Sequence, residues 1–228
     1  MPIYKLSDEL WFPGPEEFED NLVAMGGDLS VSRLLLAYSK GIFPWYDEPG
    51  NPHWYCPEER CMFHVPSFKP SKSLRNVRNQ GIYKCTFDLG FEVVLDGCSS
   101  GDREDATWIL PEVMEAYTEL HKLGFAHSVE VWRRNEELGI STIVGGLYGV
   151  SIGGMFFGES MFSQEPNTSK LALWFLVERC KEWGIEWIDA QVPNDHLFSM
   201  GAEVIPRETF LEHLKEALKM PTHRGVWK

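Results

Sequence analysis

Two short segments of this chain place polar side chains where they can support chemistry. In Ile188–Val192, the order Ile-Asp-Ala-Gln-Val puts Asp189 and Gln191 on one face of a predicted strand, because alternate residues of a strand point the same way. The run is otherwise apolar, so this face must find polar partners or border a cavity. A carboxylate beside a cavity is a candidate general base. A satisfied structural network is the alternative.

Glu159 stands in the second segment, Gly158–Ser163, which follows a predicted strand and precedes a predicted helix. Loops at such junctions lie at one edge of the sheet, where α/β folds usually bind ligands. We therefore expect Glu159 either to bind a ligand or to accept structural hydrogen bonds. Ser160, His196 and Asp189 have the composition of a hydrolase triad. The segment lacks the G-x-S-x-G nucleophile elbow, however, so a triad is not expected.

The elements that must position these segments alternate between helix and strand. Periodicity and cap residues predict helices at 71–79, 91–98, 169–183, 194–200 and 208–219, and another that begins at Pro111 and ends before Gly124. Strands are predicted at 83–87, 127–132, 143–150, 151–158 and 185–192, with residues 159–168 as a loop. This order predicts an α+β fold with a GNAT-like mixed sheet and flanking helices.

The first part of the chain is richer in loops and prolines than the rest. Within it, Ser30 is predicted to cap a short helix that ends before Gly41. We expect a small N-terminal domain over residues 1–62 and the GNAT-like domain over residues 63–228.

A basic stretch interrupts an acidic chain, whose formal net charge is −13. Residues 62–87 contain no Asp or Glu, and their basic residues are Lys69, Lys72, Arg75, Arg78 and Lys84. Binding to nucleic-acid phosphates requires such local positive potential, whereas a solvated helix face is the alternative. The negative net charge argues against a protein whose whole surface is basic and binds nucleic acid.

Cysteine usage and hydropathy indicate whether disulfides, metal sites or membrane spans are expected. The five cysteines form no CxxC pair, and reduced thiols are the simplest account of them. His53, Cys56, Cys61 and His64 are poorly spaced for zinc, so no metal is expected. No uninterrupted apolar run approaches the roughly 18 residues of a membrane span, so no transmembrane helix is expected.

Seven blocks, taken in order, resemble the bacterial leucyl/phenylalanyl-tRNA–protein transferases. They are Gly-Gly-Asp-Leu-Ser at 26–30, Gly-Ile-Phe-Pro-Trp-Tyr at 41–46, Thr-Trp-Ile at 107–109, Leu-Gly-Phe-Ala-His-Ser-Val-Glu-Val-Trp at 123–132, Gly-Gly-Leu-Tyr-Gly-Val at 145–150, Phe-Gly-Glu-Ser-Met-Phe-Ser at 157–163 and Ile-Asp-Ala-Gln-Val at 188–192. Each block alone is a weak signal, but the ordered set is highly specific.

The resemblance implies an aminoacyl-transfer reaction. Reduced thiols favour a cytoplasmic location, and a monomer is expected. Leu or Phe, and less readily Met, would move from aminoacyl-tRNA to acceptor proteins with N-terminal Arg or Lys. That transfer marks the acceptors for degradation by the N-end rule. The aminoacyl ester is already activated, so no cofactor or metal is expected.

The resemblance also assigns residues by matched position. Asp189, Gln191 and Glu159 are expected in the catalytic site, where Asp189 would take the proton of the acceptor amine directly or through Gln191. Glu159 would attract the cationic acceptor or bind the ribose. The residues expected against the aminoacyl group and the terminal adenosine are Trp45, Trp108, Leu147, Phe156, Met161 and Ile188. The basic stretch from Lys69 to Lys84 would hold the tRNA acceptor stem.

Three departures from the family pattern affect the expected pocket preference. Ala190 replaces the usual Cys, Tyr55-Cys56-Pro57 replaces the usual Trp-Ser-Pro, and residues 139–143 lengthen a turn. None of them removes a polar site residue.

Two rival functions remain open at this point. An acetyl-CoA-dependent GNAT N-acetyltransferase would share the fold, but it needs an R/Q-x-x-G-x-G/A loop that residues 159–170 lack. A non-catalytic binder of aminoacyl-tRNA would tolerate loss of Asp189 and Gln191.

Overall fold

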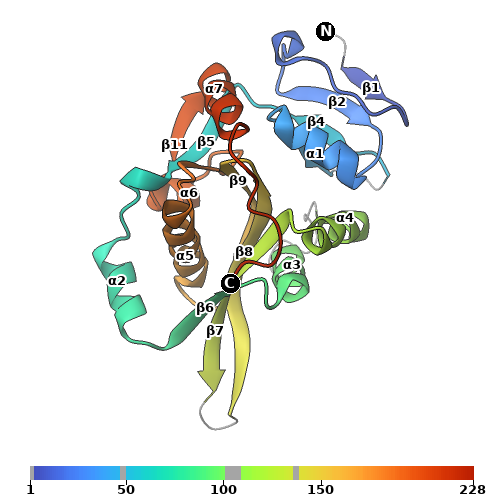
Figure 1. Ribbon diagram of the computed structural model, residues 1–228. Helices are drawn as coiled ribbons and strands as arrows, with labels where there is room; N and C mark the ends of the chain where they lie inside the picture. Colours follow the sequence, from blue (N-terminus) through green and yellow to red (C-terminus); the bar gives the residue numbers. More distant parts are fainter. Residues whose placement is uncertain (1–2, 47–49, 101–108, 136–138) are drawn as a thin grey trace.

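Two β-sheets and seven α-helices make up the computed structural model, which describes residues 3–46, 50–100, 109–135 and 139–228 (Figure 1). The smaller sheet contains β1 (Tyr4–Leu6), β2 (Leu22–Gly26), β3 (Phe43–Trp45) and β4 (His53–Tyr55). The larger sheet contains β5 (Glu59–His64), β6 (Tyr83–Phe87), β7 (Ala126–Asn135), β8 (Ile140–Ile152), β9 (Met155–Ser163), β10 (Trp187–Asp189) and β11 (Glu203–Pro206). The helices are α1 (Val31–Ser39), α2 (Lys72–Asn79), α3 (Phe91–Ser99), α4 (Pro111–Lys122), α5 (Thr168–Glu182), α6 (Asp195–Ser199) and α7 (Arg207–Ala217).

The larger sheet is mixed. Its strand order is β11-β5-β10-β9-β8-β7-β6. Among these neighbours β9 and β10 pair parallel, whereas the other pairs in the described residues are antiparallel. The predicted α+β class, a mixed sheet with flanking helices, is therefore confirmed.

The helices begin where local sequence predicts. The side-chain oxygen of Ser30 accepts a hydrogen bond from the Arg33 backbone N–H (3.3 Å), which caps α1. Ser71 does the same for Leu74 (3.1 Å) at the start of α2. Pro111 occupies the first turn of α4, where a missing N–H costs nothing. In the described residues, no helix is both long enough and apolar enough to cross a membrane.

The predicted strand at 151–158 and the predicted loop at 159–168 are both wrong. β8 continues to Ile152 and the chain turns at Gly153, which has a φ of +57°, so residues 151–158 are not one strand. β9 then runs to Ser163, so Glu159 lies inside a strand and not in a strand-to-helix loop. Pairing with β8 extends β9 through residues whose own β propensity is low, such as Gly158.

Helices cover both faces of the larger sheet. α5 packs on one face, and α3 and α4 pack on the other (Figure 1). Successive residues of a strand point to opposite faces. Accordingly, Leu147 belongs to the apolar cluster beneath α5, while the adjacent Tyr148 belongs to the cluster beneath α3 and α4.

Arg207, at the start of α7, joins the two sheets. Its buried guanidinium donates to the backbone carbonyl oxygens of Phe18 (2.9 Å), Asp20 (3.1 Å) and Cys56 (2.8 Å). A buried cation needs such acceptors, because an unpaired charge out of water is costly. The smaller sheet is thereby held against the C-terminal helix.

Candidate aminoacyl-transfer site

The larger sheet separates between β9 and β10 where the two polar segments meet. The two strands pair as far as Phe157 and Asp189. Beyond that point β9 remains paired with β8, while the chain after β10 remains with β5 through the Ala190 N–H and the Cys61 carbonyl (2.8 Å). Side chains from both separated segments therefore reach the same place.

A β-bulge aims Glu159 at this separation. The register between β8 and β9 shifts so that Tyr148 lies opposite Ser160 and Gly149 lies opposite Gly158. Glu159 is thus an extra residue without a partner on β8. Bulges redirect a side chain in this way, and they are frequent beside active sites.

Three donors hold the Glu159 carboxylate. The Tyr38 hydroxyl donates to Oε1 (2.7 Å) and the Tyr117 hydroxyl donates to Oε2 (3.0 Å). The Gln191 side-chain amide also donates to Oε1 (3.0 Å), across the separation between the strands. Residues from α1, α4 and the segment after β10 therefore converge on one carboxylate.

Burial raises the pKa of the Glu159 carboxyl group to about 7. The three hydrogen bonds to the carboxylate oppose the rise, and the nearby charge of Asp189 adds to it. A carboxyl group with this pKa exchanges its proton near neutral pH. That property suits a proton acceptor in catalysis.

Asp189 and Gln191 do not share a strand face as predicted. β10 ends at Asp189, and Gln191 adopts a φ of +61°, which lies outside the strand region. The Gln191 backbone N–H instead donates to Asp189 Oδ1 (2.8 Å). The short polar contact stabilises a turn that periodicity does not predict.

The Asp189 carboxylate is fully buried against Arg60. Arg60 Nε donates to Oδ1 (2.8 Å) and Nη2 donates to Oδ2 (2.6 Å), and neither side chain is exposed. The Arg60 guanidinium also lies over the rings of Phe43 and Phe210. Asp189 is therefore not among the residues that line the adjacent cavity.

A cavity of about 720 Å³ lies at the separation between the strands. Its size is that of a small-molecule site. Apolar walls come from the α5 face of the sheet: Phe63, Leu147, Phe156, Met161, Leu173, Leu176 and Ile188. The other half is lined by Trp45 from the smaller sheet, Cys98 from α3, Tyr148 from β8 and Ile109, and Glu159 and Gln191 line the cavity between the two halves.

The structure brings together most of the residues expected at the site. Those that line this one cavity are Trp45, Leu147, Phe156, Glu159, Met161, Ile188 and Gln191. Asp189 lies behind its wall, in contact with Gln191. Trp108 lies outside the described residues.

The five basic residues from Lys69 to Lys84 are all exposed, on α2 and its flanking segments. Arg78 differs from the other four. Its guanidinium forms a bidentate ion pair with Glu178 (2.5 and 3.0 Å) and lies over the Trp174 ring. Part of the local positive charge is thereby neutralised.

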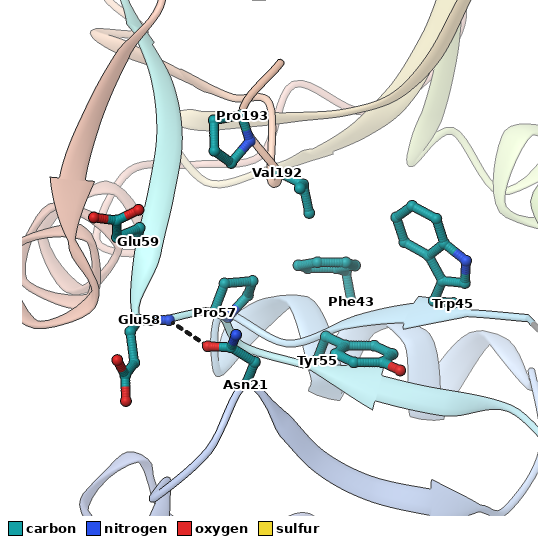
Figure 2. Close-up of a pocket in the computed structure, with 9 residues that line it drawn as sticks. All are labelled: Asn21, Phe43, Trp45, Tyr55, Pro57, Glu58, Glu59, Val192 and Pro193. Carbon is teal, nitrogen blue, oxygen red and sulfur yellow. Dashed lines mark hydrogen bonds between the residues drawn. The ribbon is translucent and has the colours of Figure 1, made fainter.

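A second cavity of about 610 Å³ adjoins the first and shares Trp45, Val192 and Pro193 with it. Figure 2 shows the rings of Phe43, Trp45 and Tyr55 along one side and Val192 opposite them. Glu58 and Glu59 lie away from Trp45, with their carboxylates turned from the rings (Figure 2). Among the described residues that line this cavity there is no Lys or Arg.

Three partners of the polar site are absent from the sequence-based prediction. Tyr38 and Tyr117 fit the apolar faces of their helices, so periodicity places them only in the core. A buried phenol nevertheless needs a hydrogen-bond partner, which is the signal that can identify them. Arg60 precedes a buried run and carries no local signal for its pairing with Asp189.

Metal ligands are not grouped in the part of the chain that is described. No set of three or more His, Cys, Asp or Glu side chains lies close enough there to hold a metal ion. All five cysteines are free thiols, and four of them are buried.

A cavity with an apolar half, a polar centre and a ring-lined half suits the transfer of an apolar acyl group, and the chain is an aminoacyltransferase. The family described as leucyl/phenylalanyl-tRNA protein transferase matches residues 62–215, and the N-terminal domain of that family matches residues 27–58. The chain belongs to the leucyl/phenylalanyl-tRNA–protein transferase family.

Full-length relatives agree with this assignment. The leucyl/phenylalanyl-tRNA–protein transferase of Thermodesulfovibrio yellowstonii is 48% identical, and the alignment covers 100% of this chain and 91% of that protein. The transferase of Myxococcus xanthus is 47% identical over 100% and 97% of the two chains. That of Maridesulfovibrio salexigens is 46% identical over 100% and 94%.

Among solved structures, L-PGS from Bacillus licheniformis aligns with 76% of this chain and 54% of its own. The TM-score is 0.38 and the identity is 16%, which is too low a likeness to support an argument about fold or function.

Replacing Asp189 with Ala is expected to destabilise the protein strongly. The Arg60 charge would remain buried without a partner, which costs about 3–5 kcal/mol of unfolding free energy. The paired variant Arg60→Met/Asp189→Leu removes both charges and should retain more stability than Asp189→Ala. Urea denaturation of the three proteins measures this order. A paired variant less stable than Asp189→Ala would contradict it.

Glu159→Gln is expected to change how stability depends on pH. The folded-state pKa of Glu159, about 7, lies above its ordinary value of 4.5, so the folded state keeps a proton that the unfolded chain releases. Wild-type stability should therefore decline as pH rises from about 5 to 8, by about 3 kcal/mol relative to the variant. Denaturation at several pH values tests this. Parallel curves would show that the carboxyl group titrates normally.

Proposed function

We propose that this enzyme transfers Leu or Phe from aminoacyl-tRNA to the N-terminal Arg or Lys of acceptor proteins, as a cytoplasmic monomer. The two-sided cavity with Glu159 and Gln191 at its centre is the observation that carries the proposal. The transfer would mark the acceptors for degradation by the N-end rule. The separation of two parallel strands around the cavity also supports a GNAT-like main domain, over residues 63–228, beside the small N-terminal domain over residues 1–62.

The donor spans the separation between β9 and β10. The apolar half beneath α5 takes the Leu or Phe side chain, because its apolar walls offer dispersion contacts. Trp45 in the other half offers a ring on which the terminal adenine can stack, and Trp108 is proposed as a second such ring. The ester that joins the two parts then lies beside Glu159 and Gln191.

Glu159 is our candidate for the proton acceptor. The acceptor's α-amine nitrogen bonds to the ester carbonyl carbon and gives a proton to the Glu159 carboxylate. The bond from that carbon to the ribose oxygen then breaks, and the proton returns to the departing oxygen. The products are the acceptor protein extended by one peptide bond and uncharged tRNA, and the Glu159 carboxylate is regenerated.

Asp189 serves as a positioning residue in this scheme. It fixes the Gln191 backbone by accepting its N–H, and Gln191 in turn donates to Glu159. Its carboxylate is paired with Arg60 and is not among the residues that line the cavity. This proposal differs from the sequence-based hypothesis, in which Asp189 takes the proton and Glu159 attracts the acceptor or binds the ribose.

The second cavity is our candidate route for the acceptor. It shares the lining residues Trp45, Val192 and Pro193 with the donor cavity, so an amine bound there would lie close to the ester. An acceptor that begins with Arg or Lys carries two positive charges at that end. Aromatic rings and the carboxylates of Glu58 and Glu59 favour such a cation.

Glu159→Gln is expected to lower kcat for transfer by a factor of about 10²–10⁴, the typical contribution of a general base. Wild-type kcat/KM should rise with pH through about 7, where Glu159 loses its proton. The kcat/KM of the variant should lack this rise near pH 7, and its pH dependence should reflect only deprotonation of the acceptor's α-amine. Transfer from radiolabelled Phe-tRNA to a protein that starts with Arg, with acetyl-CoA as a control donor, measures both. A wild-type kcat in Glu159→Gln would refute the assignment of Glu159 as the general base.

The paired variant Glu58→Gln/Glu59→Gln should raise KM for an Arg-initiated acceptor by about tenfold, since attraction of the cation by these carboxylates is lost. KM for Phe-tRNA should stay constant. Glu212→Gln removes an exposed carboxylate elsewhere, on α7, and is the matched control. An effect on KM for tRNA and not for the acceptor would assign the cavity to the donor.

Charge reversal at Lys72 and Arg75 should raise KM for Phe-tRNA by at least about tenfold and reduce the salt dependence of binding, because phosphate contacts are lost. The same reversal at Lys215 and Lys219, on and after α7, is the control for net charge. Arg78→Glu alone should have less effect than Arg75→Glu, since Glu178 already neutralises Arg78. Equal effects of the Lys72/Arg75 and Lys215/Lys219 reversals on KM for Phe-tRNA would exclude a localised tRNA surface.

A further inference from the structure

Six buried side-chain atoms of the described residues have no hydrogen-bond partner, and they belong to Arg33, Arg60, His127, Tyr148 and Ser151. Tyr148 is the one residue of these five that lines the donor cavity. A buried polar atom without a partner costs stability, so natural proteins rarely retain one. Retention beside a ligand cavity indicates that the missing partner belongs to the ligand.

Packing fixes the Tyr148 ring on one face of the sheet. The ring meets those of Phe91 and Tyr117 edge to face, at centroid distances of 6.0 and 5.5 Å. Its neighbour Leu147 points to the α5 face, where the amino-acid side chain is proposed to bind. Tyr148 therefore belongs to the half of the cavity that contains Trp45.

The Tyr148 hydroxyl keeps its proton. Complete burial raises its pKa well above 10, and the charge of Glu159 raises it further. Two similar phenols, Tyr38 and Tyr117, already donate to that carboxylate. The third phenol is thus a donor that lacks an acceptor.

We propose that the Tyr148 hydroxyl donates a hydrogen bond to a ribose oxygen of the donor's terminal nucleoside. This inference rests on the proposed function and extends it, because it names a residue that recognises the nucleoside and is indifferent to the amino acid. The side chains of Leu and Phe have no acceptor atom, whereas the ribose carries several oxygens. Adjacent residues of β8 then contact different parts of the donor: Leu147 contacts the amino acid and Tyr148 contacts the sugar.

Tyr148→Phe tests the proposal, because it removes one oxygen and leaves the ring. We expect kcat/KM for Phe-tRNA and for Leu-tRNA to fall by the same factor, about tenfold. Binding of a non-hydrolysable 3′-phenylalanylamido adenosine, measured by calorimetry, should weaken by a similar factor. The melting temperature should stay constant or rise, because an unpaired polar atom has been removed.

Ser151→Ala is the matched control. Ser151 lies on the same strand and also carries a buried hydroxyl without a partner, but it does not line the cavity. Its variant should transfer at the wild-type rate. Leu147→Ala should instead alter the ratio of Phe to Leu transfer.

Two results would overturn the assignment of Tyr148. One is binding of the adenosine analogue by Tyr148→Phe within about twofold of wild type. The other is a change in the Phe/Leu ratio, which would place Tyr148 with the amino acid. Failure of the wild-type protein to transfer from Phe-tRNA would instead refute the proposed function, and the analogue titration would still report on Tyr148.

Discussion

The buried ion pair between Arg60 and Asp189 is the constraint on which the site depends. It joins β5 to the end of β10, where the larger sheet begins to open. The guanidinium lies between the ring of Phe43, from the smaller sheet, and the ring of Phe210, from α7. The carboxylate also fixes the left-handed backbone of Gln191. One pair of charges thus holds four elements around the point where the reaction is proposed to occur.

Opening a sheet between parallel strands produces a cavity with two chemically different halves. Each strand presents successive residues to opposite faces, so the α5 side becomes apolar while the α3 and α4 side receives phenols and a carboxylate. A ligand that joins an apolar side chain to a polar nucleoside matches this division. In the proposed arrangement its ester lies at the boundary between the halves, where Gln191 donates a hydrogen bond to Glu159.

The helices and the cavity lining could be predicted from the sequence, but the polar contacts could not. Cap residues such as Ser30 act within a few positions, and the ordered motifs identify the lining through the family resemblance. Tyr38 and Glu159 are 121 positions apart, and Arg60 and Asp189 are 129 apart. Local periodicity cannot predict contacts between residues so far apart in the sequence. For the same reason it placed Glu159 in a loop, since a bulge is defined by the opposite strand.

The contacts of Arg207 have a consequence for how the protein folds while it is being synthesised. Its guanidinium holds the carbonyl oxygens of Phe18, Asp20 and Cys56, and so ties the sheet that carries Trp45 to the C-terminal helix. During translation these carbonyls emerge from the ribosome long before Arg207 does. The sheet that carries Trp45 therefore gains this anchor only after Arg207, which follows Phe18 by 189 positions, has been added, and a nascent chain that stops short of Arg207 lacks it.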